Sequence, residues 1–225
     1  MTTAGRPRLT AWGLPLGPLA ANAYLVGDEV SGEAVVIDPG QEPGPLLERI
    51  EAERWQVMAI LCTHAHFDHI AGASVVQARC GARVHVPSAE RAWLAEPALN
   101  LSAALAPAGV AEVRLDDVDS MGIEAGFELA LGGEPTLRAL GTPGHTPGGL
   151  SFLVTDLGVA GAVFTGDTLF AGTIGRADLP GGDAALLLKS IRTALLTLPG
   201  ATAVLPGHGR ASRIEDERAM NPFLA

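Results

Sequence analysis

A dense cluster of histidines beside an apolar segment constrains the fold of this chain more than any other feature of its sequence. Three of the 6 histidines, together with an aspartate, fall within the stretch HAHFDH, residues 64–69. The residues just before it, VMAILC, form the apolar run expected of a buried strand. Imidazoles crowded there would repel one another on protonation and would be costly to desolvate without a cation to organise them. The cluster therefore predicts a metal site at the end of a strand.

The spacing within this cluster predicts two directions for its side chains. His64 and His66 lie two residues apart in extended chain, so both side chains point to the same side and could grip one ion. Asp68 and His69 are adjacent at the turn into the next predicted helix. Their side chains should diverge from the first pair, so they could serve a second ion.

Three more candidate ligands lie in glycine-containing turns after other predicted strands: His145 in TPGHTPGG, Asp167 in TGDTLF and His208 in LPGHG. Ligands at the same ends of several strands converge in space, and glycine lets the backbone turn sharply. Imidazole and carboxylate donors without thiolate suit Zn²⁺, Fe or Mn²⁺, and a carboxylate can bridge two cations roughly 3.5–4 Å apart. Taken singly, His145 or His208 could instead be a turn or core histidine, and Asp167 a helix cap. His85, in RVHV, lies outside these motifs and is interpreted as structural.

The hydrophobic pattern predicts an α+β chain in which strands and helices occur in both halves. The predicted strands are residues 22–27, 34–37, 57–62, 83–86, 127–131, 136–140, 151–155, 162–165 and 201–205. The predicted helices are residues 43–55, 70–80, 88–94, 183–198 and 214–220, with a helix and loops expected across 95–123. This alternation indicates two mixed sheets covered by outer helices, a four-layer αββα sandwich.

Length and composition favour a single globular domain over residues 1–225. The chain is 48% hydrophobic and 18% charged, which allows a sizeable core, and it has no linker or repeat. Its net charge of -10 disfavours binding to nucleic acid or to an anionic membrane surface. The 2 cysteines lack metal-binding spacing and suit a reducing compartment, so we expect a cytoplasmic protein.

The N-terminal residues also resemble a targeting signal. Arg6 and Arg8 precede the mostly apolar LTAWGLPLGPLAANA, but Pro15, Gly17 and Pro18 interrupt that stretch. We therefore expect it to belong to the fold. No stretch approaches the roughly 18 uninterrupted apolar residues of a membrane span.

In its motifs and in their order along the chain, the sequence resembles the metallo-β-lactamase superfamily, in particular its glyoxalase II-like (hydroxyacylglutathione hydrolase-like) branch. The motifs are NAYLVGD, AVVIDPG, THAHFDH, GTPGHTPG, TGDTLF, PGHG and the terminal NPF. The resemblance implies the roles of eight residues: His64, His66 and His145 as ligands of a first metal, Asp68, His69 and His208 as ligands of a second, Asp167 as the bridging carboxylate, and Asp38 as a residue supporting the site from behind.

The same resemblance implies a hydrolase with two divalent metal ions, Zn, Fe or Mn, in which Asp68 and Asp167 are also catalytic. Between two cations a water loses a proton near neutral pH and becomes a nucleophile. Thioesters are natural targets because their thiolate leaving group departs without a strong acid. We therefore expect a small-molecule substrate of the S-2-hydroxyacylglutathione type. The sequence leaves the oligomeric state open.

Substrate recognition is less well specified by the sequence. Glyoxalase II enzymes carry a lysine after the bridging aspartate and an aromatic residue two positions later; here Arg176 and Asp178 occupy those positions. Arg176 is thus a candidate for substrate binding, and its alternative is a loop salt bridge with Asp178 or Asp183.

The main alternative function is that of a persulfide dioxygenase with one Fe(II) held by His64, His145 and Asp167. Those enzymes usually have GCGR where this chain has TIGR, which favours the hydrolase. A secreted β-lactamase, a tRNA-processing nuclease and a non-enzymatic metal-binding scaffold are weaker alternatives.

Overall fold

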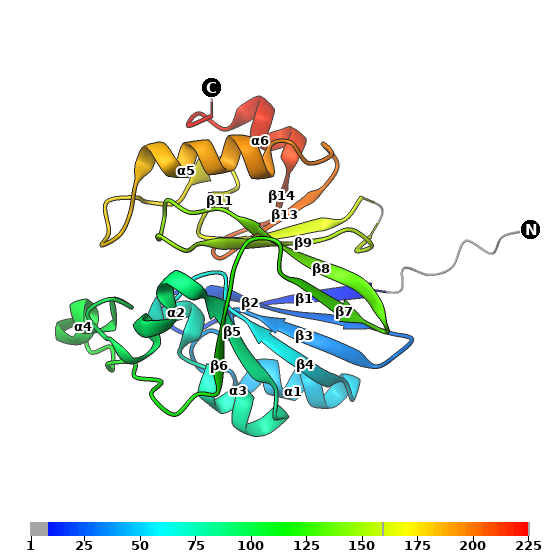
Figure 1. Ribbon diagram of the computed structural model, residues 1–225, viewed down its shortest axis with the longest axis vertical. Coiled ribbons are helices and arrows are strands. Elements are labelled where there is room, and N and C mark those ends of the chain that lie inside the picture. The colour runs from blue at the N-terminus through cyan, green and yellow to red at the C-terminus, as the bar shows by residue number, and fades with distance from the viewer. Residues whose placement is uncertain (1–8, 159, 225) are drawn as a thin grey trace, which may run out of the picture.

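The computed structural model describes residues 9–158 and 160–224, and Arg6 and Arg8 of the possible targeting signal lie outside them. Two six-stranded sheets pack face to face, and helices cover the outer face of each (Figure 1). The predicted four-layer αββα sandwich is therefore confirmed. Among the described residues, no helix has the length and apolar character needed to cross a membrane.

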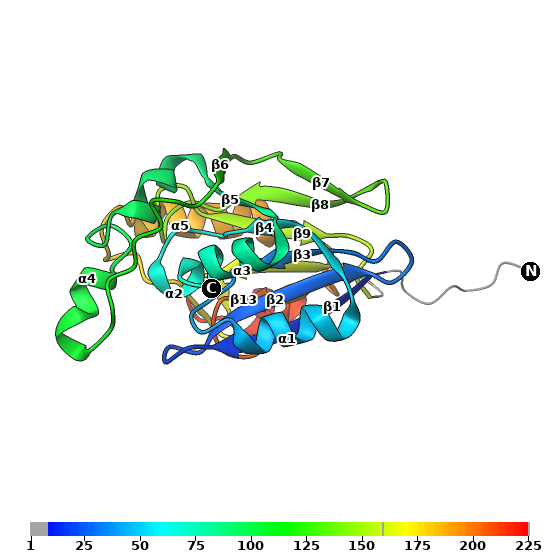
Figure 2. The same ribbon diagram turned by 90° about the horizontal axis from the view of Figure 1, so that it is seen from below.

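The first sheet comes from the N-terminal half of the chain and has the strand order β1-β2-β3-β4-β5-β6. Its first three strands are antiparallel neighbours, and β3 to β6 run parallel. Helices α1 and α3 connect its parallel strands and lie on its outer face (Figure 2). The elements are β1 (Leu9–Leu16), β2 (Ala21–Asp28), β3 (Glu33–Ile37), α1 (Gly44–Glu53), β4 (Gln56–Leu61), α2 (Phe67–Ile70), α3 (Ala73–Cys80), β5 (Arg83–Pro87) and β6 (Ser120–Ile123).

The second sheet comes from the C-terminal half and has the order β14-β13-β10-β9-β8-β7. Only β10 and β13 are parallel neighbours, and α5 and α6 cover the outer face (Figure 1). Its elements are β7 (Glu128–Leu131), β8 (Glu134–Gly141), β9 (Leu150–Val154), β10 (Ala162–Gly166), α5 (Ala184–Ser190), β13 (Ala203–Pro206), β14 (Ser212–Arg213) and α6 (Ile214–Met220). The remaining elements are the 3₁₀ segments η1 (Ser88–Ala95) and η2 (Ala106–Ala108), α4 (Ser102–Leu105), the two-stranded pair β11 (Leu169–Phe170) and β12 (Thr173–Ile174), and η3 (Ile191–Leu195).

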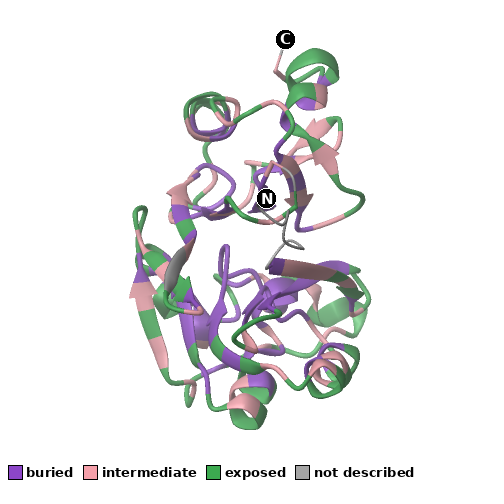
Figure 3. Cartoon of the chain, turned by 90° about the vertical axis from the view of Figure 1, so that its right-hand side faces the viewer, coloured by how far each residue is buried: buried purple, intermediate pink, exposed green. Residues whose placement is uncertain are grey.

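Alternating side chains of the central strands fill two different apolar layers. In β3, Val35 and Ile37 face the second sheet, whereas Ala34 and Val36 face the outer helices. This two-sided burial follows from the period of two in a strand and explains why these strands read as continuous apolar runs. Buried residues therefore concentrate in the sheets, and the outer helices keep exposed faces (Figure 3).

Two predicted helices differ from the structure, and only the first of them is interrupted. The helix expected over 70–80 is instead α2 and α3, because the backbone N–H of Gly72 donates to the carbonyl of Gly40 and not to a residue of the preceding turn. The helix expected over 183–198 consists of α5 followed by the π-helical turn η3. The segment 95–123, for which a helix and loops were expected, also contains strand β6, so that expectation was incomplete.

Candidate metal centre

The predicted ligands all follow the carboxyl ends of strands that point to one edge of the sandwich. His64 and His66 follow β4, with Asp68 and His69 in the short helix α2 directly after them. In the second sheet, His145 follows β8, Asp167 follows β10 and His208 follows β13. Strands β8 and β10 both pair antiparallel with β9, and β13 runs parallel to β10, so their carboxyl ends coincide. The fold thus gathers residues that are up to 144 positions apart.

Backbone bonds between the two sheets hold this edge together. Asn22 donates its backbone N–H to the carbonyl of Gly207, at 2.7 Å, and Leu150 donates to the carbonyl of Thr63, at 2.8 Å. Each bond joins a strand of one sheet to a ligand-bearing loop of the other. The relative position of the two halves of the centre is therefore fixed by main-chain contacts.

The seven side chains form three overlapping clusters that could hold metal ions, in each of which the donor atoms lie within 4.8 Å of one another. We name two of them the first donor group (His64, His66, His145) and the second donor group (Asp68, His69, His208). The third cluster joins His64, His69 and Asp167, and so connects the two groups. Six residues thus supply two separate three-ligand sets, and Asp167 lies where they meet.

Asp167 presents its two carboxylate oxygens to histidines of both donor groups. Its Oδ1 lies 3.4 Å from Nε2 of His69, and its Oδ2 lies 3.7 Å from Nε2 of His145 and of His208. The adjacent Gly207 is required for this placement, because a side chain there would collide with Oδ1 of Asp167. This is the position that a bridging carboxylate needs.

Contacts at Nδ1 orient four of the imidazoles so that Nε2 faces the centre, where Nε2 of His145 lies 3.0 Å from Nδ1 of His66. Nδ1 of His64 lies 3.0 Å from the hydroxyl of Thr63, and Nδ1 of His145 lies 2.7 Å from the carbonyl of Arg176. The corresponding partners are Asp38 for His69 and the carbonyl of Leu19 for His208. Such outer contacts fix the ring orientation and the tautomer of a metal-binding histidine.

Asp38 lies behind the centre. Its Oδ1 accepts the backbone N–H of Thr63, its Oδ2 accepts the Thr63 hydroxyl, both at 2.7 Å, and Oδ2 is also 3.0 Å from Nδ1 of His69. The carboxylate is 1% exposed, so it has no access to solvent. These contacts agree with the supporting role expected for Asp38.

Four of the donor atoms are buried without a hydrogen-bond partner, as expected of residues that bind a cation. Nε2 of His64, His66 and His69 and Oδ1 of Asp167 are all inaccessible, and none has a hydrogen-bond partner among the described residues. Polar atoms buried in this way are costly unless something satisfies them. Converging imidazole nitrogens and carboxylate oxygens are the donors that Zn, Fe and Mn accept, so the residues fit a metal pair.

Two histidines of the first donor group, His64 and His66, are held neutral. Burial lowers the pKa of His64 well below its usual value, and the neighbouring histidines lower it further. Burial and the proximity of His145 lower the pKa of His66 to about 3. Both imidazoles therefore carry free lone pairs at neutral pH, which a metal ligand requires.

The second donor group is electrostatically different because it contains a carboxylate. Burial alone would lower the pKa of His69, but Asp68 and Asp167 raise it well above the usual value. Burial opposes protonation of His208 as well, yet its hydrogen bond with Asp68 raises its pKa. Without metal, this group therefore favours protonated histidines more than the first group does, and a cation would have to compete with protons there.

Glu90, which the sequence pattern did not single out, joins two ligand-bearing loops. Its side chain is fully buried, and its Oε2 accepts the backbone N–H of Ala65, between two predicted ligands, at 2.7 Å. Its Oε1 accepts the backbone N–H of Gly148 at 2.8 Å, in the loop that carries His145. Burial raises the pKa of this carboxyl, and the two backbone bonds lower it. Only a fold that brings η1 beneath both loops makes these contacts, so no local sequence signal could have indicated them.

A cavity of about 350 Å³ opens directly over the centre, and Arg176 is among its lining residues. The guanidinium of Arg176 makes two hydrogen bonds of 2.8 Å to the carboxylate of Asp178, and both side chains are largely exposed. The salt bridge considered as the alternative role of Arg176 therefore exists. It does not remove Arg176 from the cavity wall.

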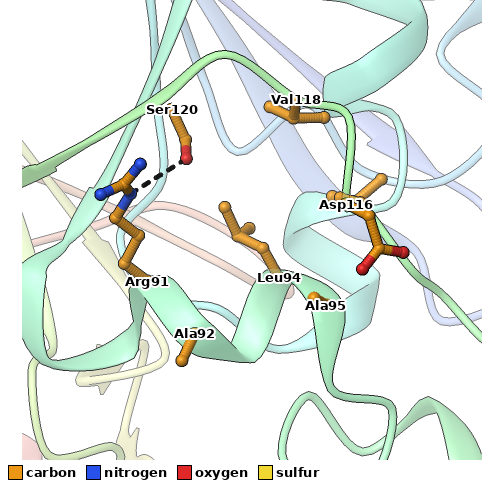
Figure 4. Close-up of a pocket in the computed structure, with 8 residues that line it drawn as sticks. Arg91, Ala92, Leu94, Ala95, Asp116, Val118 and Ser120 are labelled. Carbon is orange, nitrogen blue, oxygen red and sulfur yellow. Dashed lines mark hydrogen bonds between the residues drawn. The ribbon is translucent and has the colours of Figure 1, made fainter.

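Another hollow, of about 400 Å³, lies between η1 and the segment leading to β6 (Figure 4). Arg91 crosses it and donates to the hydroxyl of Ser120 at 3.2 Å. None of the predicted ligands lines it. His85 also lies outside the donor groups: its ring packs on Phe127, with 5.4 Å between the ring centroids, as expected for a structural histidine.

Comparisons with known proteins agree with this architecture. The model of the metallo-beta-lactamase superfamily matches residues 16–208. The chain is 42% identical to the "Probable metallo-hydrolase YqgX" of Bacillus subtilis, over 94% of this chain and 95% of that protein. It is 34% identical to the "Hydroxyacylglutathione hydrolase GloC" of Haemophilus influenzae, over 94% of this chain and 96% of that protein.

Solved structures of related proteins have the same fold. The B3 metallo-beta-lactamase BLEG-1 superposes with a TM-score of 0.87 at 36% identity, covering 96% of this chain and 100% of that one. The protein TTHA1623, solved in a di-iron-bound form, has a TM-score of 0.79 at 34% identity, with 95% and 100% covered. The chain belongs to the metallo-β-lactamase superfamily, and the relationship inferred from its motifs is confirmed. It is a member of a metallo-hydrolase superfamily with a buried His/Asp cluster suited to metal.

Proposed function

We propose that this protein is a binuclear metal-dependent hydrolase that cleaves a thioester, with S-2-hydroxyacylglutathione compounds as the first class of substrate to test. The observation that carries the proposal is the pair of complete donor groups that share the carboxylate of Asp167. The similarity to a hydroxyacylglutathione hydrolase and to a protein solved with two iron ions supports it.

The proposed roles of the residues follow from their positions. Two bound cations would supply Lewis acidity, polarising the thioester carbonyl and making a water acidic enough to attack it near neutral pH. In the overall reaction the water oxygen bonds to the carbonyl carbon and the C–S bond breaks, giving a carboxylate, a thiol and a proton. Asp68 and Asp167 contribute two negative charges to the site, and Asp167 sets the separation of its two halves.

Arg176 is proposed to contact the substrate, because it lines the cavity over the donor groups. Since the residue is exposed and already paired with Asp178, it contributes to binding and not to the chemical step. Replacing Arg176 with alanine should raise KM and leave kcat and the metal content unchanged. Unaltered kinetics would restrict Arg176 to its loop salt bridge.

The alternative, an iron dioxygenase, would use His64, His145 and Asp167 around one ion. It would leave the second donor group without a function as ligands. Ile174 also stands where those enzymes usually have cysteine. A binuclear hydrolase would use every buried donor of the centre, and for that reason we favour it over the dioxygenase.

Two assays on one purified sample test the proposal. Hydrolysis of S-lactoylglutathione is followed by the loss of thioester absorbance, and oxygen consumption is followed with glutathione persulfide as substrate. Thioester cleavage without oxygen uptake is the expected result. Oxygen uptake without thioester cleavage would overturn the proposal in favour of the dioxygenase.

A further inference from the structure

The cavity over the donor groups has an apolar side whose leucines belong to no part of the core. Leu19 lies in the turn between β1 and β2, Leu101 and Leu105 flank or end α4, and Leu179 follows β12. None of the four is a member of the three apolar clusters formed by the described residues. We call these four residues the leucine wall.

The leucine wall is accessible and faces reactive groups. Leu19 is 44% exposed, and the other three leucines are half-buried. They share the cavity with His66, Asp68, His145 and Asp167, which provide donor atoms of the centre. Apolar side chains from three separate segments of the chain thus converge beside the candidate metal centre.

Apolar side chains exposed to water beside the candidate metal centre are energetically unfavourable, and a ligand that covers them removes this cost. Ligand sites are typically concave and largely apolar, with a few polar groups that fix orientation, and volumes begin at about 300 Å³. The cavity of about 350 Å³ fits this description, with the donor groups as its polar part.

The charge of the cavity also favours an apolar ligand. Arg176 is the one cationic side chain of lysine or arginine type among its lining residues, and it is paired with Asp178. The part of a substrate that lies inside the cavity should therefore be uncharged, and the carboxylates of a glutathione group would lie outside it.

We propose that the leucine wall binds an apolar chain of the substrate, so that the preferred substrates are thioesters carrying an aliphatic group of several carbons. This inference rests on the proposed function, because it places the thioester carbonyl at the donor groups. The aliphatic group can belong to the acyl part or to the thiol part, and both sources present the same surface to the wall.

Two substrate series distinguish these sources. In the first, the thiol is always glutathione and the acyl group grows from acetyl through butyryl and hexanoyl to octanoyl. In the second, the acyl group is always acetyl and the thiol grows from ethanethiol to octanethiol. Where the growing chain lies on the wall, kcat/KM should rise about fourfold per buried methylene, from about 0.8 kcal/mol each.

Variants of the wall test whether the leucines cause the preference. Leu105→Ser and Leu179→Asn should each flatten the dependence of kcat/KM on chain length. Leu99→Ser is the matched control, because Leu99 is 37% exposed close to α4 but does not line the cavity. The control should keep the slope of the unmodified protein.

The outcomes separate this inference from the function on which it rests. A rising slope in either series that the wall variants flatten supports the inference and identifies the source of the chain. Thioester hydrolysis with no slope in either series, or with slopes equal in wall variants and control, overturns the inference but leaves the hydrolase intact. Absence of hydrolysis for every thioester overturns both.

Discussion

Replacing Glu90 with alanine should weaken metal binding although Glu90 is not one of the predicted ligands. The carboxylate connects the loop of His64 and His66 to the loop of His145 through two backbone N–H groups. Both halves of the first donor group therefore depend on one buried side chain. Without it, the loops lack the connection that holds their ligands at a common distance.

The size of the effect follows from the two hydrogen bonds that the substitution removes. Leaving a buried N–H without a partner costs about 1–3 kcal/mol, so two such donors cost about 2–6 kcal/mol. Removing Glu90 also removes the cost of burying a carboxylate, so the lower part of this range, about 2–4 kcal/mol, is expected for alanine. Glu90→Gln keeps one acceptor oxygen and should lose about half as much. Loss of an outer contact of a metal site typically lowers metal affinity about 10–100-fold.

Two measurements on each variant separate a positioning role from a structural one. Urea unfolding of the metal-free protein gives the stability loss, and competition with a chelator gives the metal affinity. Glu96→Ala, at an exposed position just beyond η1, serves as the control and should change neither. If Glu90→Ala unfolds more easily but binds metal with unchanged affinity, the positioning role is refuted.

Three further predictions concern the donor groups and the histidine that lies outside them. Asp167→Asn removes charge between the donor groups, so it should lose much of the bound metal and nearly all turnover; unchanged activity would refute the site. His85→Ala, whose ring lies outside the groups, should keep its full metal content by elemental analysis, and a loss would show that His85 was misassigned. On acidification from neutral pH, the ion of the second donor group should leave first. Its histidines have raised pKa values and accept protons at higher pH than His64 and His66, whose pKa values are lowered. Earlier loss from the first group in a pH-resolved metal titration would contradict this order.

The sequence singled out residues that the fold brings together, because their signals are local. Histidine spacing within HAHFDH, and single polar residues after apolar strands, depend only on strand ends and glycine turns. The layered fold followed from the same alternation of strands and helices. Strand β1 was not predicted, because Pro15 was interpreted as an interruption of the apolar stretch; as the edge strand of its sheet, β1 tolerates a proline.

Other features depend on contacts between distant segments, which no local pattern reveals. Glu90 bonds to residues 25 and 58 positions away. The break between α2 and α3 arises from the packing of Gly72 on Gly40 rather than from a local stop signal. The leucine wall likewise combines three segments whose leucines look ordinary in sequence.

We propose that two donor groups sharing Asp167 bind two ions, and the number of metal ions per chain decides whether they do. The protein is purified without added metal, its metal content is measured by mass spectrometry, and the sites are located by anomalous diffraction. The account predicts close to two ions per chain, one in each donor group, with Asp167 between them. One ion held by His64, His145 and Asp167, with the second donor group empty even when metal is supplied in excess, would contradict it.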